Sequence, residues 1–236
     1  MNLILLAPEQ VVSDDRYALN ERQLKHIQQV LKKGQGDTLR VGVLNGAIGD
    51  AEFDAVQGEA VIQSLSIAPP KALPLELVLA LPRPNMLKRT LMNITAMGVK
   101  TIYLLNSAKV EKSYWQSPVL TEASLHSYLI EGLEQARDTV LPTLHRQVRF
   151  RPFVEDILPT IMNGKIGLVA HPYQAEACPV ALTEPSILAI GPEGGWNEFE
   201  MQKWGEVGMK TVHLGDRILK VETAVPVLLS RLYPAY

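Results

Sequence analysis

Two glycine-rich segments near the end of the chain have the residue types of a ligand-binding site. Residues 187–197 pass from an apolar stretch through the run Gly-Pro-Glu-Gly-Gly into a helix-capping pattern. Residues 214–224 again join apolar chain to a helical pattern through a glycine, and they carry Arg217, Lys220 and Glu222. Glycines after buried strands let the backbone approach a ligand closely. In open α/β sheets, ligands bind beyond the carboxyl ends of the strands, where both segments are expected to lie.

The first segment matches no common phosphate-binding pattern. The run in residues 187–197 is not the Gly-x-Gly-x-x-Gly of dinucleotide-binding folds, and it lacks the Lys-Ser/Thr of a phosphate-binding loop. Taken alone, this segment is also compatible with a tight turn between a strand and a helix. The second segment is likewise compatible with a solvated loop that holds a Lys–Glu pair.

The remaining chemistry-bearing residues favour neither a metal site nor a disulfide. The five histidines show no spacing typical of metal ligands, so no metal is expected. Cys178 is the single cysteine, which excludes an internal disulfide, and an isolated thiol most often packs in the interior. Trp115, Trp196 and Trp204 can stack on bases, although packing is the commoner use of such side chains.

Composition and charge narrow the class of protein. A chain of 236 residues with 47% apolar and 20% charged residues can bury a core without disulfides, and it is not collagen-like, coiled-coil or disordered. No apolar run reaches the roughly 18 residues of a membrane span, and the N-terminus lacks the basic region of a signal peptide. We therefore expect a cytoplasmic protein without membrane association.

The distribution of charge leaves two interpretations open. The net charge of −2 argues against a uniformly basic nucleic-acid binder. Residues 83–151, however, contain 10 Lys and Arg against 5 Asp and Glu. This basic middle can hold phosphates on one face of the folded protein, or it is an ordinary solvated surface.

The elements that must position these residues suggest two domains. Residues 1–70 read as a β-rich barrel or sandwich with one helix, which begins at Asn20 and places Leu24, Ile27, Val30 and Leu31 on one face. The proline-rich residues 69–74 form a stiff linker. Residues 73–236 alternate apolar strands with helices, which predicts a parallel α/β sheet covered on both faces.

Together, the two glycine segments resemble the signature of the RsmE-like family, the bacterial 16S rRNA uridine-N3 methyltransferases of the SPOUT superfamily. Residues 190–195 match the family's Ile-Gly-Pro-Glu-Gly-Gly at each position. Residues 214–224 match Leu-Gly-x-Arg-Ile-Leu-Arg-x-Glu-Thr-Ala except at Lys220, where the family usually has arginine. His26 and the residues up to Gly36-Asp37 are similar to the family's His-x-x-x-Val-Leu-Arg-x-x-x-Gly-Asp, with Lys32 in place of arginine.

The middle of the chain departs from that family. Residues 134–138, Glu-Gln-Ala-Arg-Asp, stand where the family usually has Glu-Gln-Ser/Cys-Gly-Arg. Residues 81–85, Leu-Pro-Arg-Pro-Asn, replace a turn of the type Pro-Lys-Gly-Asp-Arg. These differences bear on the RNA face rather than on the cofactor loops.

The resemblance implies a fold and a cofactor. It implies an N-terminal PUA-like small β-barrel that binds RNA, followed by a SPOUT-type α/β domain with a C-terminal trefoil knot, an exception to the general avoidance of threading. Three loops after strands would bind S-adenosylmethionine. The cofactor contacts expected by analogy are Val169, His171, Gly191, Glu193, Gly194, Gly195, Leu214, Gly215, Ile218 and Leu219.

It also implies a reaction, the transfer of a methyl group to N3 of a uridine. That nitrogen carries a proton at neutral pH, so the enzyme must help to remove it or stabilise the anion. Arg217 is expected to stabilise the anion, Glu222 to act as a base or as a partner of Arg217, and Glu193 is a third candidate.

The expected partners are the 16S rRNA of the small ribosomal subunit and a second copy of the chain. The final helix carries Val225, Leu228, Leu229 and Leu232 on one face, which can form a homodimer or pack on its own domain. The expected RNA contacts are Arg16, Arg22, Lys25, Lys32, Arg83, Lys88 and Arg89. Two alternatives remain: a non-catalytic RNA-binding protein of ribosome assembly, and a SPOUT methyltransferase acting on the ribose 2′-OH.

Overall fold

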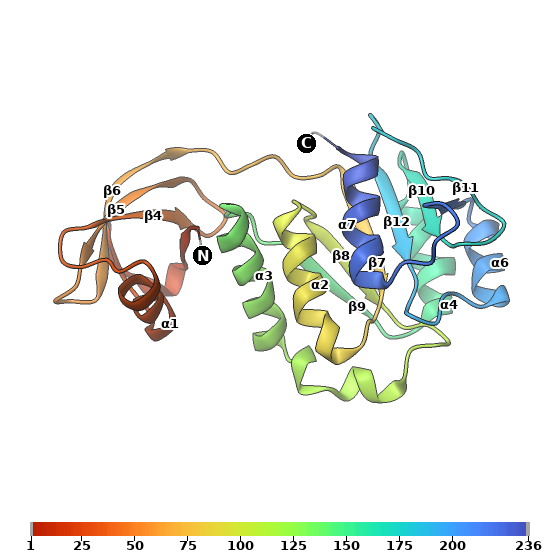
Figure 1. Cartoon of the computed structure of the whole chain (residues 1–236), viewed down its shortest axis with the longest axis horizontal. Helices are drawn as coiled ribbons and strands as arrows, with labels where there is room; N and C mark the ends of the chain where they lie inside the picture. Colours follow the sequence, from red (N-terminus) through yellow and green to blue (C-terminus); the bar gives the residue numbers. More distant parts are fainter. Residues whose placement is uncertain (1, 235–236) are drawn as a thin grey trace. The chain divides into compact units, whose positions relative to one another are not determined.

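The computed structural model describes residues 2–234, which form two compact units (Figure 1). The first unit consists of Met1–Lys71 and Leu129–Leu141. The second consists of Ala72–Tyr128 and Pro142–Tyr236. The sequence places residues 129–141 in the later domain, whereas the compact unit that contains them here is the first.

The first unit is built on a six-stranded mixed sheet with the order β1-β4-β5-β6-β3-β2. Only the β1–β4 pair is parallel, and the other pairs within this sheet are antiparallel. Side chains alternate along β4 and β5, so Leu39, Val41, Ala51 and Phe53 enter the core of this unit. The strands are β1 (Ile4–Leu6), β2 (Val11–Ser13), β3 (Arg16–Ala18), β4 (Thr38–Val43), β5 (Ile48–Asp54) and β6 (Glu59–Ile67).

The helix of this unit begins as expected but ends differently. Asn20 accepts the N–H of Gln23 and caps α1 (Glu21–Lys25). The next residues, His26–Val30, form a π-helical turn in which the N–H of Leu31 donates to the carbonyl of His26. The wider turn shifts the apolar face. Ile27 is buried, whereas Val30 and Leu31 are exposed, so the expected four-residue apolar face is wrong at its last two positions.

The long helix α3 (Glu122–Ala136) contributes its C-terminal half to the first unit. Leu133 packs there with Leu3, Leu5 and Ile48. The chain that follows α3 is held by hydrogen bonds to the β4–β5 turn. Thr139 Oγ1 donates to the carbonyl of Gly46, and the N–H of Asn45 donates to the carbonyl of Thr139 at 2.8 Å. These polar contacts explain why a segment distant in sequence completes this unit.

The second unit is a seven-stranded parallel sheet with the order β11-β13-β10-β12-β7-β8-β9. All of β12 is buried, as expected for a strand covered on both faces. The strands are β7 (Leu75–Ala80), β8 (Thr101–Leu105), β9 (Thr143–Gln147), β10 (Ile166–Ala170), β11 (Glu176–Ala177), β12 (Ser186–Ile190) and β13 (Lys210–His213).

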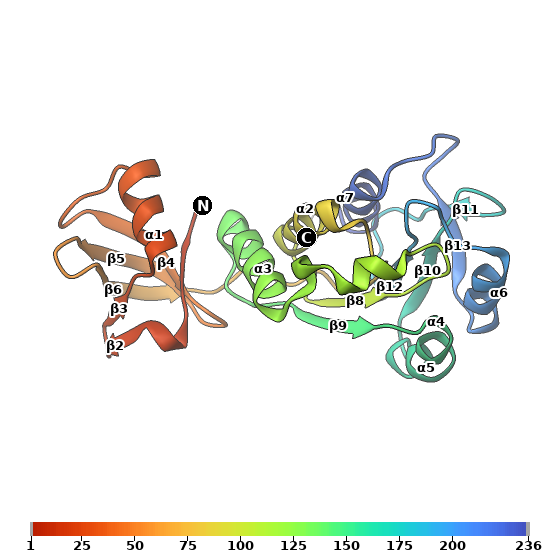
Figure 2. The ribbon, with the colours of Figure 1, turned by 90° about the horizontal axis from the view of Figure 1, so that it is seen from below.

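Helices flank this sheet on both sides. Figure 2 shows α2 and α7 along one face and α4 and α5 along the other. The α/β class predicted from the sequence is therefore confirmed, while the trefoil knot stays a prediction. The helical segments are α2 (Pro84–Ala96), η3 (Lys112–Gln116), η4 (Pro118–Leu120), α4 (Phe150–Pro152), η5 (Phe153–Ile157), α5 (Leu158–Ile161), α6 (Glu198–Glu206) and α7 (Val221–Leu232).

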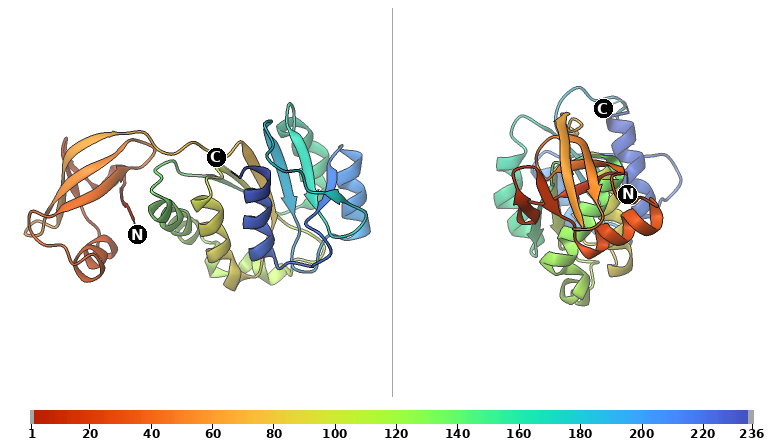
Figure 3. Two further views of the ribbon diagram at one scale, coloured as in Figure 1. Left: turned by 45° about the horizontal axis from the view of Figure 1, so that its top comes forward. Right: turned by 90° about the vertical axis from the view of Figure 1, so that its left-hand side faces the viewer.

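The apolar face of α7 is covered by its own unit. Val225, Leu228, Leu229 and Leu232 are each at most 1% exposed, and α7 lies beside α2 (Figures 1 and 3). These four side chains therefore pack within their own unit, and the homodimer stays a prediction. Within residues 2–234, no helix combines the length and the apolar character needed to cross a membrane.

Candidate functional site

The three loops expected to bind the cofactor lie together at one edge of the parallel sheet. Strands β13, β10 and β12 are adjacent and parallel, so their carboxyl ends point the same way. His171 follows β10, residues 191–197 follow β12, and residues 214–220 follow β13. The N–H of His171 donates to the carbonyl of Val212 at 3.0 Å, which joins the first loop to the last strand. This edge is where ligands bind in open α/β sheets.

Two positions of the β12 loop require glycine for different physical reasons. A Cβ on Gly191 would lie 3.2 Å from the ring of Trp196, so a side chain there would crowd the indole. Gly195 has a φ of +68°, in the left-handed region that other residues rarely adopt, and open space lies beside it. Its N–H donates to the carbonyl of Pro192 at 2.8 Å. The loop is thus a tight turn that also leaves backbone accessible to a ligand.

Lys109, which sequence reasoning missed, holds this loop from a strand two positions away from β12 in the sheet. It follows β8, and its Nζ donates to the carbonyl of Gly194 at 2.7 Å. A Cβ on Gly194 would lie 2.9 Å from Cδ of Lys109, so the lysine stem lies directly against the glycine. In the sequence, Lys109 is one of ten cations in the basic middle, and nothing there distinguishes it from the others.

His171 has an unsatisfied polar atom at the same edge. Its Nδ1 is buried and has no hydrogen-bond partner within the described residues. Burial, followed by the positive charge of Lys109, lowers the pKa of His171 below its usual 6.5. The imidazole is therefore neutral at pH 7 and offers one donor and one acceptor. An orphaned ring nitrogen beside open glycine backbone fits a polar ligand, S-adenosylmethionine included.

Glu193 and Arg83 meet at this edge although 110 positions separate them. Glu193 is exposed, and its Oε1 accepts the backbone N–H of Arg83 at 3.2 Å. Arg83 is the N-cap residue of α2 and follows β7. The structure thus brings a residue expected to act in catalysis next to one expected to contact RNA.

The β13 loop is exposed over most of its length. Ile218 is 74% exposed, and the Arg217 side chain takes part in no hydrogen bond or ion pair among residues 2–234. Glu222 is half-buried in the first turn of α7. Gly215, with a φ of +105°, donates its N–H to Nδ1 of His213 at 2.9 Å. Arg217 and Glu222 are available to a ligand but do not pair with each other.

The three remaining expected cofactor contacts differ in how exposed their side chains are. Val169 lies inside β10 and is 0% exposed, so its side chain is part of the sheet core. Leu214 is half-buried at the end of β13, and Leu219 is exposed. Any contribution of Val169 to a ligand is therefore indirect.

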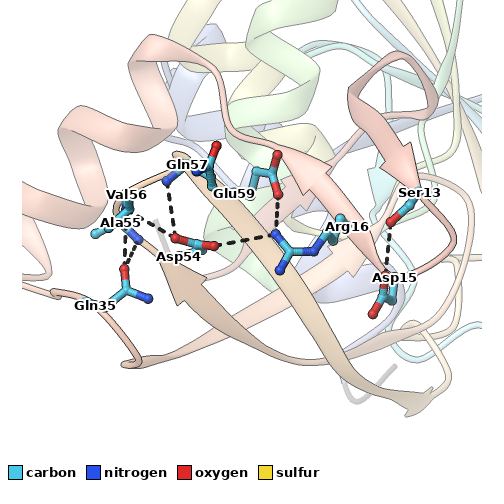
Figure 4. A network of polar contacts seen from close by, with 9 residues as sticks. All are labelled: Ser13, Asp15, Arg16, Gln35, Asp54, Ala55, Val56, Gln57 and Glu59. Carbon is cyan, nitrogen blue, oxygen red and sulfur yellow. Dashed lines mark hydrogen bonds and ion pairs between the residues drawn. The ribbon is translucent and has the colours of Figure 1, made fainter.

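The basic residues expected to contact RNA differ in whether a carboxylate holds them. Arg16 Nη1 lies 2.7 Å from Glu59 Oε2 and 3.5 Å from Asp54 Oδ2, within the polar network of Figure 4. Arg22 is paired with the buried Glu134. These two guanidiniums serve the first unit. The other members of the set, all exposed, are Lys25, Lys32, Arg83, Lys88 and Arg89.

The tryptophans and the cysteine mostly serve packing. Trp196 and Trp204 are 3% and 0% exposed and stack edge-on, with ring centroids 5.2 Å apart. Cys178 is buried, and its burial raises the pKa of the thiol. Among residues 2–234, no group of histidine, cysteine and carboxylate side chains is suited to hold a metal ion.

A small pocket at the same edge was not anticipated from the sequence. It has a volume of about 230 Å³ and lies between the chain that follows β8 and the first turn of α6. Its lining residues are Asn106, Ser107, Ala108, Phe150, Arg151, Asn197, Phe199 and Glu200.

Known proteins resemble this chain along most of its length. The RNA methyltransferase domain family matches residues 69–233. Ribosomal RNA small subunit methyltransferase E of Treponema pallidum is 32% identical over 232 residues, covering 95% of this chain and 87% of that protein. The protein of the same name from Synechocystis is 28% identical over 247 residues, covering 97% and 76%.

Solved structures agree at the level of the fold. A ribosomal RNA small subunit methyltransferase E from Neisseria gonorrhoeae, bound to S-adenosyl methionine, superposes with a TM-score of 0.78 at 20% identity, covering 97% of this chain and 96% of that one. A methyltransferase from Legionella pneumophila in complex with the same cofactor gives a TM-score of 0.77 at 21% identity, covering 97% and 95%. This chain therefore belongs to the RNA methyltransferase family, in the group of the ribosomal RNA small subunit methyltransferase E proteins.

Proposed function

We propose that the protein transfers a methyl group from S-adenosylmethionine to N3 of a uridine in the 16S rRNA of the small ribosomal subunit. The observation that carries this proposal is the convergence of His171, the β12 glycine loop and the Arg217 loop at the carboxyl ends of three adjacent parallel strands. The names of the relatives support a substrate in small-subunit rRNA. The choice of uridine N3 follows from the family that the two sequence signatures resemble.

The cofactor would be held mainly by backbone. S-adenosylmethionine, when bound, supplies an electrophilic methyl group on a sulfonium. The backbone around Gly195 and Gly215 is open, since a Cβ at either position would meet nothing within 4 Å. His171 can satisfy its buried Nδ1 by a hydrogen bond to the ligand. Lys109 keeps the glycine loop in position through the carbonyl of Gly194.

Methylation at uracil N3 requires removal of the proton on that nitrogen, and we assign this chemistry to charged residues. We assign to Arg217 the stabilisation of negative charge on the uracil, because its guanidinium is exposed beside the glycine loop of β13. Glu222 and Glu193 are the carboxylates that we assign as candidates to accept the proton. Glu193 already accepts an N–H from Arg83, which fixes its carboxylate in position.

The decisive experiment is the mapping of methyl groups in small ribosomal subunits incubated with the protein and labelled cofactor. A new N3-methyluridine at a single position is the expected result. A 2′-O-methyl product would show instead that the enzyme acts on ribose. Binding of subunits without any transfer would favour the non-catalytic role in ribosome assembly.

Two further proposals concern the setting of the reaction. We propose that the protein acts in the cytoplasm, because its substrate would be ribosomal RNA. We also propose a homodimer that uses a surface other than the covered face of α7, and the exposed Ile218 lies in the loop just before that helix. Light scattering at micromolar concentration tests the dimer, and a monomeric mass would contradict it.

A further inference from the structure

The pocket beside α6 has a size and lining that differ from those of the expected cofactor site. Pockets for drug-sized ligands span roughly 300–1,000 Å³, so a cavity of about 230 Å³ suits one planar ring. One wall is the side chain of Phe199, an aromatic ring in the first turn of α6 that is 48% exposed. Lys203 Nζ lies 5.8 Å from the centroid of that ring. Lys203 is itself paired with Glu155 and Glu206, so it is the exposed ring that offers a surface on which nucleic-acid bases stack.

Two amide side chains of the pocket are oriented by hydrogen bonds that their oxygen atoms accept. Asn106 Oδ1 accepts the indole N–H of Trp115 at 2.9 Å, and Asn197 Oδ1 accepts the N–H of Glu200 at 2.8 Å. Each amide is thereby left with its NH₂ group as the free function. Two NH₂ donors are complementary to carbonyl oxygens on a ligand.

Ser107 supplies an unsatisfied hydroxyl. The residue lines the pocket and is 3% exposed, and its Oγ is buried without a hydrogen-bond partner in residues 2–234. A buried hydroxyl that stays unpaired is unfavourable, so a partner supplied by a ligand would stabilise it. A hydroxyl that lines the same pocket as two amides can donate to a carbonyl oxygen or accept an N–H.

The surroundings of the pocket are rich in cations. Arg151 lines the pocket, and the exposed Arg149 directly precedes Phe150, another lining residue. Arg146 lies 6.0 Å from the ring centroid of Trp115. Arg151 is partly neutralised by Glu155, at 2.8 Å. These arginines end the basic segment 83–151, and guanidiniums at the rim of a base pocket are suited to the phosphates on either side of the base.

We propose that this pocket binds an unstacked uracil base of the substrate RNA, distinct from the base that is methylated. This inference rests on the proposed function, and it adds a second RNA contact that lies outside the residues expected from the sequence. A uracil stacked on Phe199 would present two carbonyl oxygens and one N–H to the two amides and to Ser107. Adenine has no carbonyl oxygen, so the pocket discriminates against it. Because the imide edge is occupied here, the methylated uracil must bind elsewhere, nearer the glycine loops.

The test is direct binding of short fluorescein-labelled oligouridylate and oligoadenylate of equal length to the full-length protein, followed by anisotropy. The wild-type protein should prefer oligouridylate. Phe199→Ala should weaken oligouridylate binding about tenfold, because a loss of that size lies within the range typical for the stacking of one base, while Phe199→Tyr should retain it. Ser107→Ala should reduce the preference for uridylate over adenylate. Val180→Ser, which changes another exposed apolar residue of the same unit, is the matched control.

Equal binding of the two oligonucleotides by the wild type, or unchanged binding by Phe199→Ala, would overturn the proposal. So would a change in molecular mass of Phe199→Ala by light scattering with RNA binding intact, since the face would then bind a protein. The assay needs neither cofactor nor transfer. A wild type that prefers uridylate but methylates no subunit would therefore overturn the proposed function alone.

Discussion

The guanidinium of Arg22 and the carboxylate of Glu134 form a two-pronged ion pair across 112 positions of the chain. Arg22 Nη1 lies 2.7 Å from Oε2 of Glu134, and Nη2 lies 2.9 Å from Oε1. Glu134 is fully buried, and its Oε1 also accepts the N–H of Leu5 at 3.4 Å. The hydrogen bond to Glu134, and then the charge of that carboxylate, raise the pKa of Arg22 above its usual value. This pair joins α1 to the C-terminal half of α3 within the first unit, so Arg22 has a structural role, while its contact with RNA stays a prediction.

We expect Glu134→Ala to destabilise the protein by about 3 kcal/mol, because removing one partner of a buried pair leaves the other charge poorly compensated. The estimate lies at the lower end of the range for such pairs, since the Arg22 side chain is 44% exposed. Urea denaturation measures the loss. Arg40→Ala is the matched control, because it breaks the exposed Arg40–Asp50 pair of the same unit and should cost less than about 1 kcal/mol. Similar losses in both variants would contradict the structural role.

Substitution of Gly195, compared with a control glycine, distinguishes an effect on stability from an effect on cofactor binding. Gly195→Ala should cost about 1 kcal/mol of stability, because an alanine is forced into the left-handed region, and it should weaken binding of S-adenosylmethionine. Gly164→Ala is the control: its φ is +73°, its Cβ also meets nothing within 4 Å, and it precedes β10 at the opposite end of that strand. Calorimetry should show equal stability losses and a change in cofactor affinity for Gly195→Ala alone. Unchanged affinity in that variant would remove the loop from the site.

The pKa of His171 should depend on the charge of Lys109. The pKa of His171 is lowered by burial and by the lysine charge, so Lys109→Met should raise it while burial keeps it below 6.5. Carbon and nitrogen chemical shifts of the imidazole measure both values. A group with a depressed pKa contributes stability that is present above pH 6.5 and lost as the pH falls through the value of the folded state. The wild type should therefore lose stability on acidification, and Lys109→Met should lose less. An unchanged pKa in the variant would place Lys109 away from the ring.

Arg217 is predicted to act in the chemical step. Because its side chain is exposed and makes no contact that supports the fold, Arg217→Ala should leave the melting temperature unchanged. Loss of one group that stabilises developing charge typically lowers kcat about 100- to 1,000-fold. Transfer of labelled methyl groups to small subunits gives the rate, and Arg217→Lys should recover part of it. A fall in cofactor affinity without a fall in kcat would assign Arg217 to binding instead.

Local signals determined most of the second unit. Strand positions follow from uninterrupted apolar runs such as residues 187–190, and the start of α6 follows from the capping box of Asn197 and Glu200, whose two hydrogen bonds are present. The family signature placed the glycine loops, because glycines with positive φ or crowded Cβ positions cannot be replaced freely. These features depend on neighbours in the chain, so the sequence alone predicts them.

Long-range contacts decided the rest. The face of α7 is equally apolar whether it meets its own unit or a second subunit, and only the folded chain shows that its own unit buries it, with α2 alongside. Likewise, Arg22 looks like any surface cation until Glu134, 112 residues away, is buried against it. Lys109 and Ser107 lie in the chain that follows β8, and only the fold brings this chain to the glycine loop and to α6. Side-chain type sets what a residue can do, but burial and the partner that it meets in space decide what it does, and neither is encoded in local spacing.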